Sequence, residues 1–227
     1  MKPLILFDID DTLLKESPTL LKSFEYVCEN VYGVKVDIYN FPRYGMTAKG
    51  IIYGLLKDKG ITENQILNKI DKAFNKMTDY FMKNMAKYDY ELIPGALNLL
   101  MKLASMNFKM GIVSGVIKPI ALERLNKAKI AQYFITGAYG EEDTLRSNLV
   151  KLAIERANIK NNHVFVVGDT PLDIEAAIET NTIPIGVATG KYSVKELINA
   201  RAKFVLKNYS VSEINKFTSF ISNYIRY

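Results

Sequence analysis

Short apolar runs alternate with helical patterns along most of this 227-residue chain. The runs predict strands at Leu4–Phe7, Lys109–Val113, Phe134–Thr136, Val164–Val167, Ile183–Val187 and Lys203–Leu206. The helical patterns between them lie at Ala96–Met106, Ile117–Lys127, Leu149–Asn158, Leu172–Thr180 and Val194–Ala200. Strands rich in Val and Ile that alternate with helices are typical of a parallel sheet buried on both faces. The sequence therefore predicts an α/β fold with a doubly wound, mainly parallel, Rossmann-like sheet.

One long segment interrupts this alternation with helical patterns alone. Residues 15–89 contain no run that resembles a strand, and Thr47–Lys57 and Thr62–Lys87 have the spacing of amphipathic helices. The segment follows the first strand directly. We therefore expect an all-helical cap domain of residues 15–89, inserted into a Rossmann-like core formed by residues 1–14 and 90–227.

The composition is that of a soluble protein with a hydrophobic core, because 48% of the residues are hydrophobic and 24% are charged. The single cysteine, Cys28, excludes an internal disulfide and a cysteine cluster for a metal. The single histidine, His163, leaves no basis for histidine catalysis or zinc binding. No signal peptide is visible, and no stretch approaches the ~20 apolar residues of a membrane span. We therefore expect a cytoplasmic protein without a membrane segment.

The charge balance points to small anions rather than to nucleic acid. The net charge of +6 comes from 30 basic and 24 acidic residues, and such an excess favours anionic ligands in general. No run of five or six basic residues occurs, and the lysines alternate with Glu and Asp, as on a solvated surface. Only the stretch that begins at Arg201 is markedly basic. Nucleic acid is therefore not an expected partner.

A first group of carboxylates follows the first predicted strand, in the sequence Asp8-Ile9-Asp10-Asp11-Thr12. Side chains on a strand alternate between faces, so Asp8 and Asp10 would project on the same side. Two carboxylates so close repel each other unless a cation or a proton lies between them. Taken alone, the pattern is equally consistent with an aspartate-rich turn that satisfies backbone donors.

Two further strand ends carry complementary chemistry. Gly168-Asp169-Thr170-Pro171-Leu172-Asp173 follows the fourth predicted strand, and Ser114-Gly115 follows the second. In parallel sheets, ligands bind beyond the carboxyl ends of the strands, where these residues would meet Asp8 and Asp10. Carboxylates alone make an oxygen-only site that suits Mg²⁺ rather than zinc, and a hydroxyl beside small backbone can hold phosphoryl oxygens. The sequence thus indicates a magnesium site next to a phosphate site.

With Asp8–Thr12, Ser114, a basic residue near Arg146 and Gly168–Asp173 in this order, the chain resembles the haloacid dehalogenase superfamily, and within it the phosphoglycolate-phosphatase-like branch. The resemblance implies that Asp8 attacks phosphorus to form an aspartyl-phosphate. It also implies that Asp10 is the general acid and base. The implied magnesium ligands are Asp8, the backbone carbonyl of Asp10, and Asp169, with Asp173 in support.

The resemblance also assigns the phosphate and substrate contacts. It implies that Ser114 binds a phosphoryl oxygen and that Arg146 neutralises the growing charge, with Lys151 as the alternative. The family usually has a lysine followed closely by proline here, and no Lys-Pro pair occurs in this region. The remaining expected substrate contacts are Thr12 and Gly115 in the core, and Arg43 and Thr47 in the cap.

The expected function is therefore hydrolysis of a small phosphomonoester by a magnesium-dependent phosphatase, with a phosphorylated metabolite as partner. The true dehalogenases of the superfamily lack an aspartate at the position of Asp10, so dehalogenation is disfavoured. A sugar-phosphate mutase of the same family and a non-catalytic binding protein remain as alternatives. The sequence does not distinguish a monomer from a homodimer, and it does not identify the substrate.

Overall fold

The centre of the molecule is a six-stranded sheet in which all neighbouring strands are parallel. The computed structural model describes residues 2–158 and 163–225. The strands are β1 (Leu4–Phe7), β2 (Lys109–Val113), β3 (Phe134–Ala138), β4 (Val164–Gly168), β5 (Ile183–Val187) and β6 (Phe204–Leu206). Their order, β3-β2-β1-β4-β5-β6, reverses direction between β1 and β4, where doubly wound sheets bind ligands. The fold class predicted from the sequence is confirmed.

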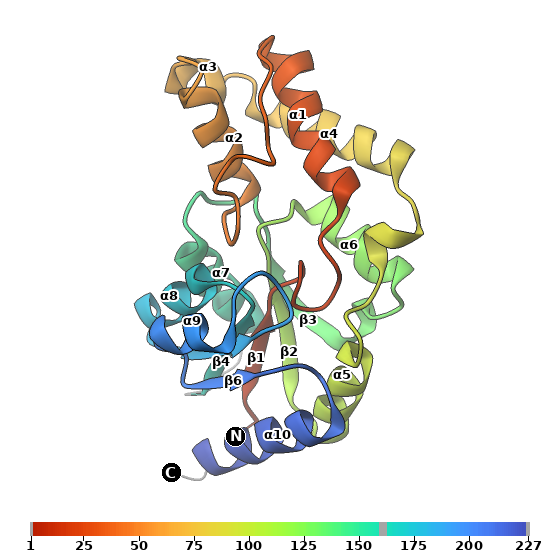
Figure 1. Cartoon of the computed structure of the whole chain (residues 1–227), viewed down its shortest axis with the longest axis vertical. Coiled ribbons are helices and arrows are strands. Elements are labelled where there is room, and N and C mark those ends of the chain that lie inside the picture. The colour runs from red at the N-terminus through yellow and green to blue at the C-terminus, as the bar shows by residue number, and fades with distance from the viewer. Residues whose placement is uncertain (1, 159–162, 226–227) are drawn as a thin grey trace.

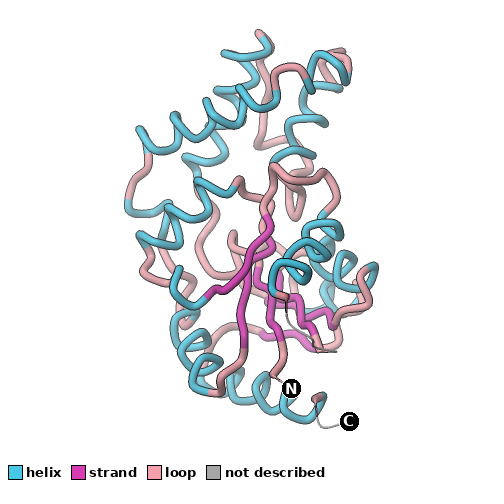
Figure 2. The backbone as a smooth tube through the Cα atoms, turned by 180° about the vertical axis from the view of Figure 1, so that it is seen from behind, coloured by secondary structure: helices cyan, strands magenta, loops and turns pink. Residues whose placement is uncertain are grey.

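Helices cover both faces of this sheet, as Figure 2 shows from behind. The helical elements of the core are α5 (Ala96–Ser105), α6 (Lys118–Lys127), the 3₁₀ turn η2 (Ala131–Tyr133), α7 (Arg146–Ala157), α8 (Pro171–Glu179), α9 (Val194–Asn199) and α10 (Val211–Tyr224). Successive side chains of a strand point to opposite faces of the sheet. Leu4 and Leu6 therefore pack with α7 and α8, whereas Ile5 and Phe7 pack with α5, α6 and α10.

The helices inserted after β1 lie beyond the carboxyl ends of the strands, in the upper part of Figure 1. They are α1 (Pro18–Tyr32), α2 (Ala48–Lys57), α3 (Glu63–Leu67), α4 (Ile70–Asn84) and the 3₁₀ helix η1 (Lys87–Tyr90). The chain therefore leaves the sheet once before α1 and returns once after η1. The domain boundaries given above stay a prediction.

The single helix expected over Thr62–Lys87 is wrong, because the chain forms α3 and α4 with a turn between them. A capping box at Thr62 starts α3, which ends after five residues. Lys69 then leaves the helical conformation, with φ −124° and ψ 0°. Ile66 before this turn and Ile70 after it are both buried. Burial of these two side chains outweighs the local preference for one continuous helix.

Two more differences concern helix positions. The helix expected to start at Leu149 begins three residues earlier, so Arg146 is its first residue. Helix α10 was not predicted, although Ile214, Phe217 and Ile221 recur at helical spacing and are all buried. From the sequence, this stretch was described only by its basic residues. In the structure, the apolar face of α10 packs on the sheet.

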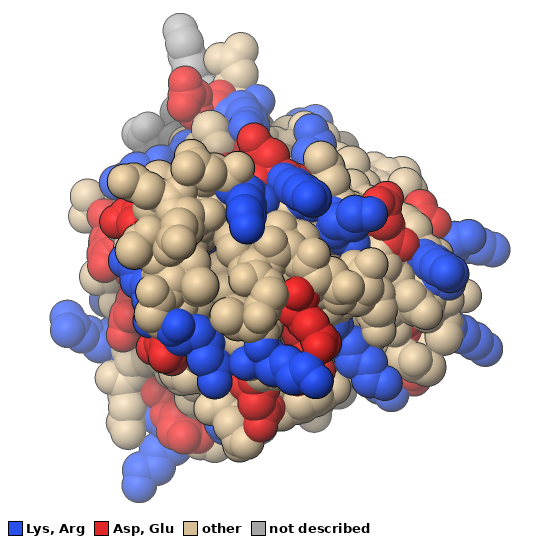
Figure 3. Space-filling model, turned by 90° about the horizontal axis from the view of Figure 1, so that it is seen from above, with Lys and Arg blue, Asp and Glu red and all other residues tan. Residues whose placement is uncertain are grey.

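The surface carries charges of both signs. In the face seen from above in Figure 3, basic and acidic side chains are interspersed rather than gathered by sign. Among the residues described, no helix is both long enough and apolar enough to cross a membrane.

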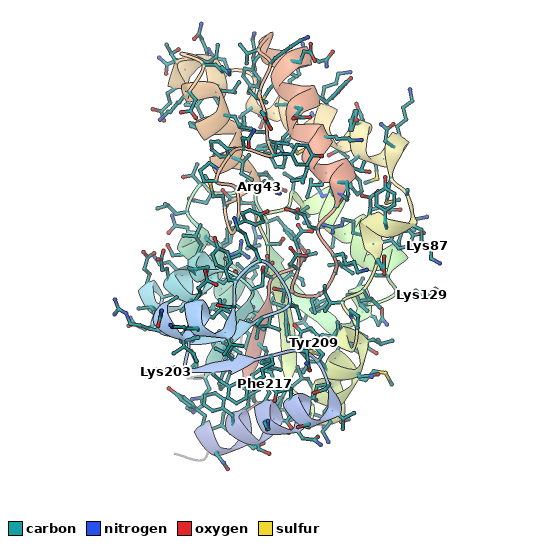
Figure 4. All side chains as sticks on the ribbon, viewed as in Figure 1. Arg43, Lys87, Lys129, Lys203, Tyr209 and Phe217 are labelled. Atoms are coloured by element: carbon teal, nitrogen blue, oxygen red, sulfur yellow. The ribbon has the colours of Figure 1, made fainter. Side chains whose placement is uncertain are left out.

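The aromatic contact between α10 and β6 allows the packing of α10 on the sheet to be tested by measurements of stability alone. Phe217, which is labelled in Figure 4, is fully buried. Its ring centroid lies 5.8 Å from the ring centroid of Phe204. We expect Phe217→Ala to lower the free energy of unfolding by about 3–5 kcal/mol, because it leaves a cavity in a packed core. Ser219→Ala, on the exposed face of the same helix, should change it by less than about 0.5 kcal/mol. Urea unfolding followed by circular dichroism measures both, and equal effects would contradict the packing described.

Candidate active site

The site begins in the loop that follows β1. Phe7 pairs with Ile112 of β2 and Val167 of β4, so Asp8 emerges between the ends of the two central neighbours. The chain then turns tightly, with Asp11 in the left-handed region at φ 53° and the amide of Leu13 bonded to the carbonyl of Ile9. This turn keeps the whole Asp8–Thr12 motif at the sheet edge.

Arg146 lies directly against Asp8. Its Nη2 donates to Asp8 Oδ1 and to the carbonyl of Val113, and its Nε forms an ion pair of 2.7 Å with Asp173 Oδ1. Its Nη1 donates to the carbonyl of Gly45 at 3.1 Å. All three charged side chains are buried. One guanidinium therefore joins the expected nucleophile, the Gly168–Asp173 motif and the loop before α2.

The second motif is held by the start of α8. Thr170 caps this helix, and the carboxylate of Asp173 accepts from the amide and the hydroxyl of Thr170 at 3.1 and 2.7 Å. Gly168 leaves room for that carboxylate, because a Cβ there would collide with it. Asp169 is buried beside the first motif and accepts from the Thr12 hydroxyl at 3.4 Å. Asp169 and Asp8 line the same pocket.

Asp10 has a different partner from Asp8. Its Oδ1 lies 2.7 Å from Nη2 of Arg124, a fully buried residue of α6, whereas 27% of the Asp10 side chain is exposed. Asp8, in contrast, is buried against Arg146. Asp8 and Asp10 are therefore each paired with a different arginine. Arg124 was not predicted as a site residue, because it occupies an ordinary position in an amphipathic helix.

Burial dominates the electrostatics of the site. It raises the pKa of Asp8 to about 7, against the attraction of Arg146 and with the support of Asp173 and Asp10. Burial, followed by the charges of Asp173 and Asp8, also raises the pKa of Asp169 well above its usual range. The site therefore carries more buried carboxylates than positive charges. Such a group is stabilised by a bound cation.

The donor atoms fit a divalent cation that prefers oxygen. Asp8 and Asp169 both line the same pocket, and the described residues offer it no histidine or cysteine. No three acidic, histidine or cysteine side chains among the described residues form a complete metal site by themselves. The metal ligands expected from the sequence therefore stay a prediction.

Ser114 and Gly115 lie at the end of β2, where the sequence predicted them. Ser114 is fully buried, and its hydroxyl accepts from the amide of Val116 at 3.2 Å. The Gly115 carbonyl accepts from the amide of Ala48 at 2.8 Å, and a Cβ on Gly115 would collide with the backbone of Met46. Gly115 therefore lets the loop before α2 approach the sheet edge.

Of the two cap residues expected to contact substrate, Arg43 lines the pocket and Thr47 does not. Thr47 caps α2, accepting from the amide of Gly50, and donates to the carbonyl of Thr144 in the core at 3.2 Å. Its hydroxyl thus holds the cap loop in place. Arg43 lines the pocket beneath the upper helices (Figure 4), where it forms a 3.1 Å ion pair with Glu16. Glu16 was not predicted as a site residue from the sequence.

A pocket between the upper helices and the sheet edge is lined by some of these groups, and Ser114 and Thr47 are not among its lining residues. Its polar lining includes the carboxylates of Asp8, Asp10, Asp11 and Asp169 with Arg146. Its remaining wall is mostly apolar and is formed by Leu20, Leu21, Phe24, Met46, Ile51 and Val116. The pocket lining therefore combines charged and apolar side chains.

An arginine beside buried carboxylates at the carboxyl edge of a doubly wound sheet is suited to binding an anionic group. A family model described as haloacid dehalogenase-like hydrolase matches residues 5–187, and the chain belongs to this family. The family resemblance noted in the sequence is therefore confirmed. The assignment to its phosphoglycolate-phosphatase-like branch stays a prediction.

Two curated relatives are phosphatases by name. Over 216 residues the chain is 24% identical to the glyceraldehyde 3-phosphate phosphatase of Methanocaldococcus jannaschii, with 85% of this chain and 87% of the relative covered. It is also 24% identical to the pyrophosphatase PpaX of Bacillus pumilus, with 91% and 92% covered. Both relatives are therefore matched over most of their length.

Solved structures share the fold. A predicted phosphatase from Clostridium acetobutylicum superposes with a TM-score of 0.73 at 24% identity, covering 96% of this chain and 98% of the other. A β-phosphoglucomutase from Clostridium difficile gives a TM-score of 0.71 at 18% identity, covering 96% and 99%. At these identities the likeness supports the architecture.

Proposed function

We propose that this chain is a magnesium-dependent phosphatase that hydrolyses a small phosphomonoester with Asp8 as its covalent nucleophile. The observation that supports this most is the placement of Asp8, which lies buried against Arg146 at the carboxyl end of β1 and lines one pocket with Asp169. The roles of Asp8 as nucleophile and of Asp10 as acid are those that the family resemblance implies. The family membership and the name of the glyceraldehyde 3-phosphate phosphatase agree with the proposal, whereas PpaX is named for pyrophosphate, which is a phosphoanhydride.

The reaction runs in two steps. An oxygen of Asp8 bonds to phosphorus as the bond from phosphorus to the leaving oxygen breaks, and Asp10 gives its proton to that oxygen. Water then attacks the phosphorus of the aspartyl-phosphate, Asp10 takes a proton from the water, and the bond between phosphorus and Asp8 breaks. The products are an alcohol and phosphate, and both aspartates regain their starting form.

Mg²⁺ is the cation that the oxygen donors fit best. Asp8, Asp169 and the carbonyl of Asp10 would hold it, and Asp173 would support the site through Thr170 and Arg146. When bound, Mg²⁺ neutralises negative charge on the phosphoryl oxygens and keeps the nearby carboxylates ionised. The raised pKa values of Asp8 and Asp169 support this role, because both carboxylates need a compensating charge.

Ser114 and the backbone at Gly115 are proposed to bind phosphoryl oxygens, together with Arg146. The guanidinium of Arg146 is already beside the attacking carboxylate, and its planar fork matches two phosphoryl oxygens. Thr12 supports Asp169 through its hydroxyl. Thr47 contributes by fixing the cap loop, since its hydroxyl is already bonded.

The pocket favours an uncharged, partly apolar leaving group. Of the described residues that line it, only Arg43 and Arg146 are cationic, and each is paired with a carboxylate. A second phosphate, as in pyrophosphate or in the bisphosphate that a mutase needs, would find no unpaired cation there. Apolar side chains such as Phe24 instead offer a surface for an organic group. We therefore favour an organic phosphomonoester over the substrate in the name of PpaX.

The function is tested by phosphate release with Mg²⁺ from a panel of organic phosphomonoesters and pyrophosphate. We expect turnover of at least one monoester, and loss of detectable turnover in Asp8→Asn, because an amide is a poor nucleophile. Asp79→Asn, which removes the same charge from the exposed face of α4, should keep full activity. Normal turnover by folded Asp8→Asn, or faster release from pyrophosphate than from every monoester, would contradict the proposal.

Mg²⁺ should stabilise the folded protein more strongly at high pH. The pKa of Asp8 rises from 3.8 to about 7 on folding, so stability from its protonated form is present at low pH and is lost as the pH rises through about 7. Mg²⁺ needs the ionised form, and saturation at 100 times its Kd would add about 2.7 kcal/mol. Thermal unfolding with Mg²⁺ and with EDTA, at about pH 5 and about pH 8, measures the difference.

The matched control for that measurement is Asp169→Asn, which should lose most of the stabilisation by Mg²⁺ while remaining folded. Asp79→Asn should retain it. A gain in melting temperature that is the same at both pH values, or the same in Asp169→Asn, would show that Mg²⁺ binds elsewhere.

Arg146, and not Lys151, should supply the positive charge at phosphorus. Lys151 is exposed, and its Nζ donates to Oδ1 of Asn148 at 3.4 Å. Arg146, in contrast, is buried against Asp8. Arg146→Ala should lower kcat by about 10²–10³-fold, as for other preorganised donors, and Lys151→Ala should leave it nearly unchanged. Circular dichroism checks the fold of both variants. The reverse order of kcat losses would transfer the role to Lys151.

A further inference from the structure

Arg124 is a charged residue in the hydrophobic interior. It lies on α6, its side chain is fully buried, and it is the largest side chain buried to this degree. The neighbours on its helix face, Ile120, Ala121 and Leu125, are apolar core residues. Burial of a guanidinium is costly unless its charge is paired and its N–H groups are bonded, and in Arg124 the Nε and Nη2 groups have partners whereas the buried Nη1 has no hydrogen-bond partner among the described residues.

The partners of Arg124 come from three separate points in the chain. Its Nε donates to the carbonyl of Asp89 at 2.6 Å, and its Nη2 donates to the carbonyl of Lys15 at 2.9 Å. The same Nη2 lies 2.7 Å from Oδ1 of Asp10. Lys15 precedes α1 and Asp89 lies in η1, so the two carbonyls belong to the two passages between the sheet and the upper helices.

The two passages are also bonded to each other. The carboxylate of Asp89 is buried and accepts from the hydroxyl of Ser17 at 2.6 Å, the hydroxyl of Thr19 at 2.8 Å and the amide of Ala86 at 2.8 Å. This cluster would connect the passages without Arg124. What Arg124 adds is the connection to Asp10, which no other described cation contacts.

We infer that Arg124 is a positioning residue that sets the orientation of the Asp10 carboxylate relative to the two passages. The inference rests on the proposed role of Asp10 as acid and base. Asp10 is partly exposed and sits in a loop, so its side chain needs a partner to keep it from turning toward Asp8 and the proposed metal ligands. The rigid fork of arginine bonds two fixed carbonyls and offers its Nη2 to the carboxylate, which a flexible lysine cannot reproduce.

The inference is tested by the leaving-group dependence of kcat/KM, with glycerol 2-phosphate and p-nitrophenyl phosphate as probes. The alkoxide of the first needs a proton as it leaves, whereas p-nitrophenolate does not, and kcat/KM reports the steps up to that departure. Acid catalysis contributes about 10²–10⁴-fold, so Asp10→Asn should lose that much more on glycerol 2-phosphate than on p-nitrophenyl phosphate. Arg124→Met should show a preferential loss of about 10²-fold, and Arg124→Lys about 10-fold.

A double-mutant cycle separates positioning from general destabilisation. In the Asp10→Asn background, Arg124→Lys should change the ratio of the two kcat/KM values less than about 2-fold, because the acid it positions is gone. Thr19→Val removes a hydroxyl bond in the same buried cluster without touching Asp10, and it should affect both probes equally. If Arg124→Met fails to fold, Arg124→Lys, which keeps the charge, carries the test alone.

Several outcomes would overturn the inference. Wild-type activity with a preferential loss in Asp10→Asn but none in Arg124→Lys would reject the role of Arg124 and leave the proposed function intact. An equal preferential loss in Thr19→Val would assign the effect to the whole cluster. No preferential loss in Asp10→Asn would reject the proposed role of Asp10 as acid and the role of Arg124 together.

Discussion

The contact of Arg146 with Asp8 and Asp173 is the interaction on which the site depends. A parallel sheet brings the ends of β1, β2 and β4 together, and the chain places carboxylates at two of these ends. Their burial would be unfavourable without a positive charge among them. A single arginine at the first position of α7 supplies it, and the start of α8 orients Asp173 to receive it. The excess of negative charge that remains is what makes the place suitable for a metal ion and a phosphoryl group.

The same arginine connects the chemistry to the upper helices. Its Nη1 reaches the carbonyl of Gly45, and the loop that contains Gly45 is bonded to the core through the amides of Ala48 and Lys49, which donate to Gly115 and Gly140. A Cβ on either Gly115 or Gly140 would collide with this backbone. The loop before α2 thus closes one side of the pocket by direct backbone contact, and small residues make the contact possible.

Much of this arrangement could be predicted, because it follows from local patterns. The strand runs and the Asp8–Thr12 and Gly168–Asp173 motifs are contiguous, so their positions at one sheet edge followed from the parallel topology. The break at Lys69 was missed because tertiary burial of Ile66 and Ile70 decides it. Arg124 was missed for a similar reason. Its partners are distant in sequence, and an arginine in an amphipathic helix is usually solvated, so only the packing of α6 reveals its burial.

The pocket has its reactive groups and its apolar wall on different parts of the chain. The carboxylates follow the strands, whereas Leu20, Phe24 and Ile51 belong to α1 and α2. Substitutions on these two helices can reshape the space for the organic group without moving an atom of the reacting centre. Sequence divergence can therefore change substrate selectivity separately from reactivity. Related chains can come to bind different organic groups through substitutions in α1 and α2, while the carboxylates after the strands are retained.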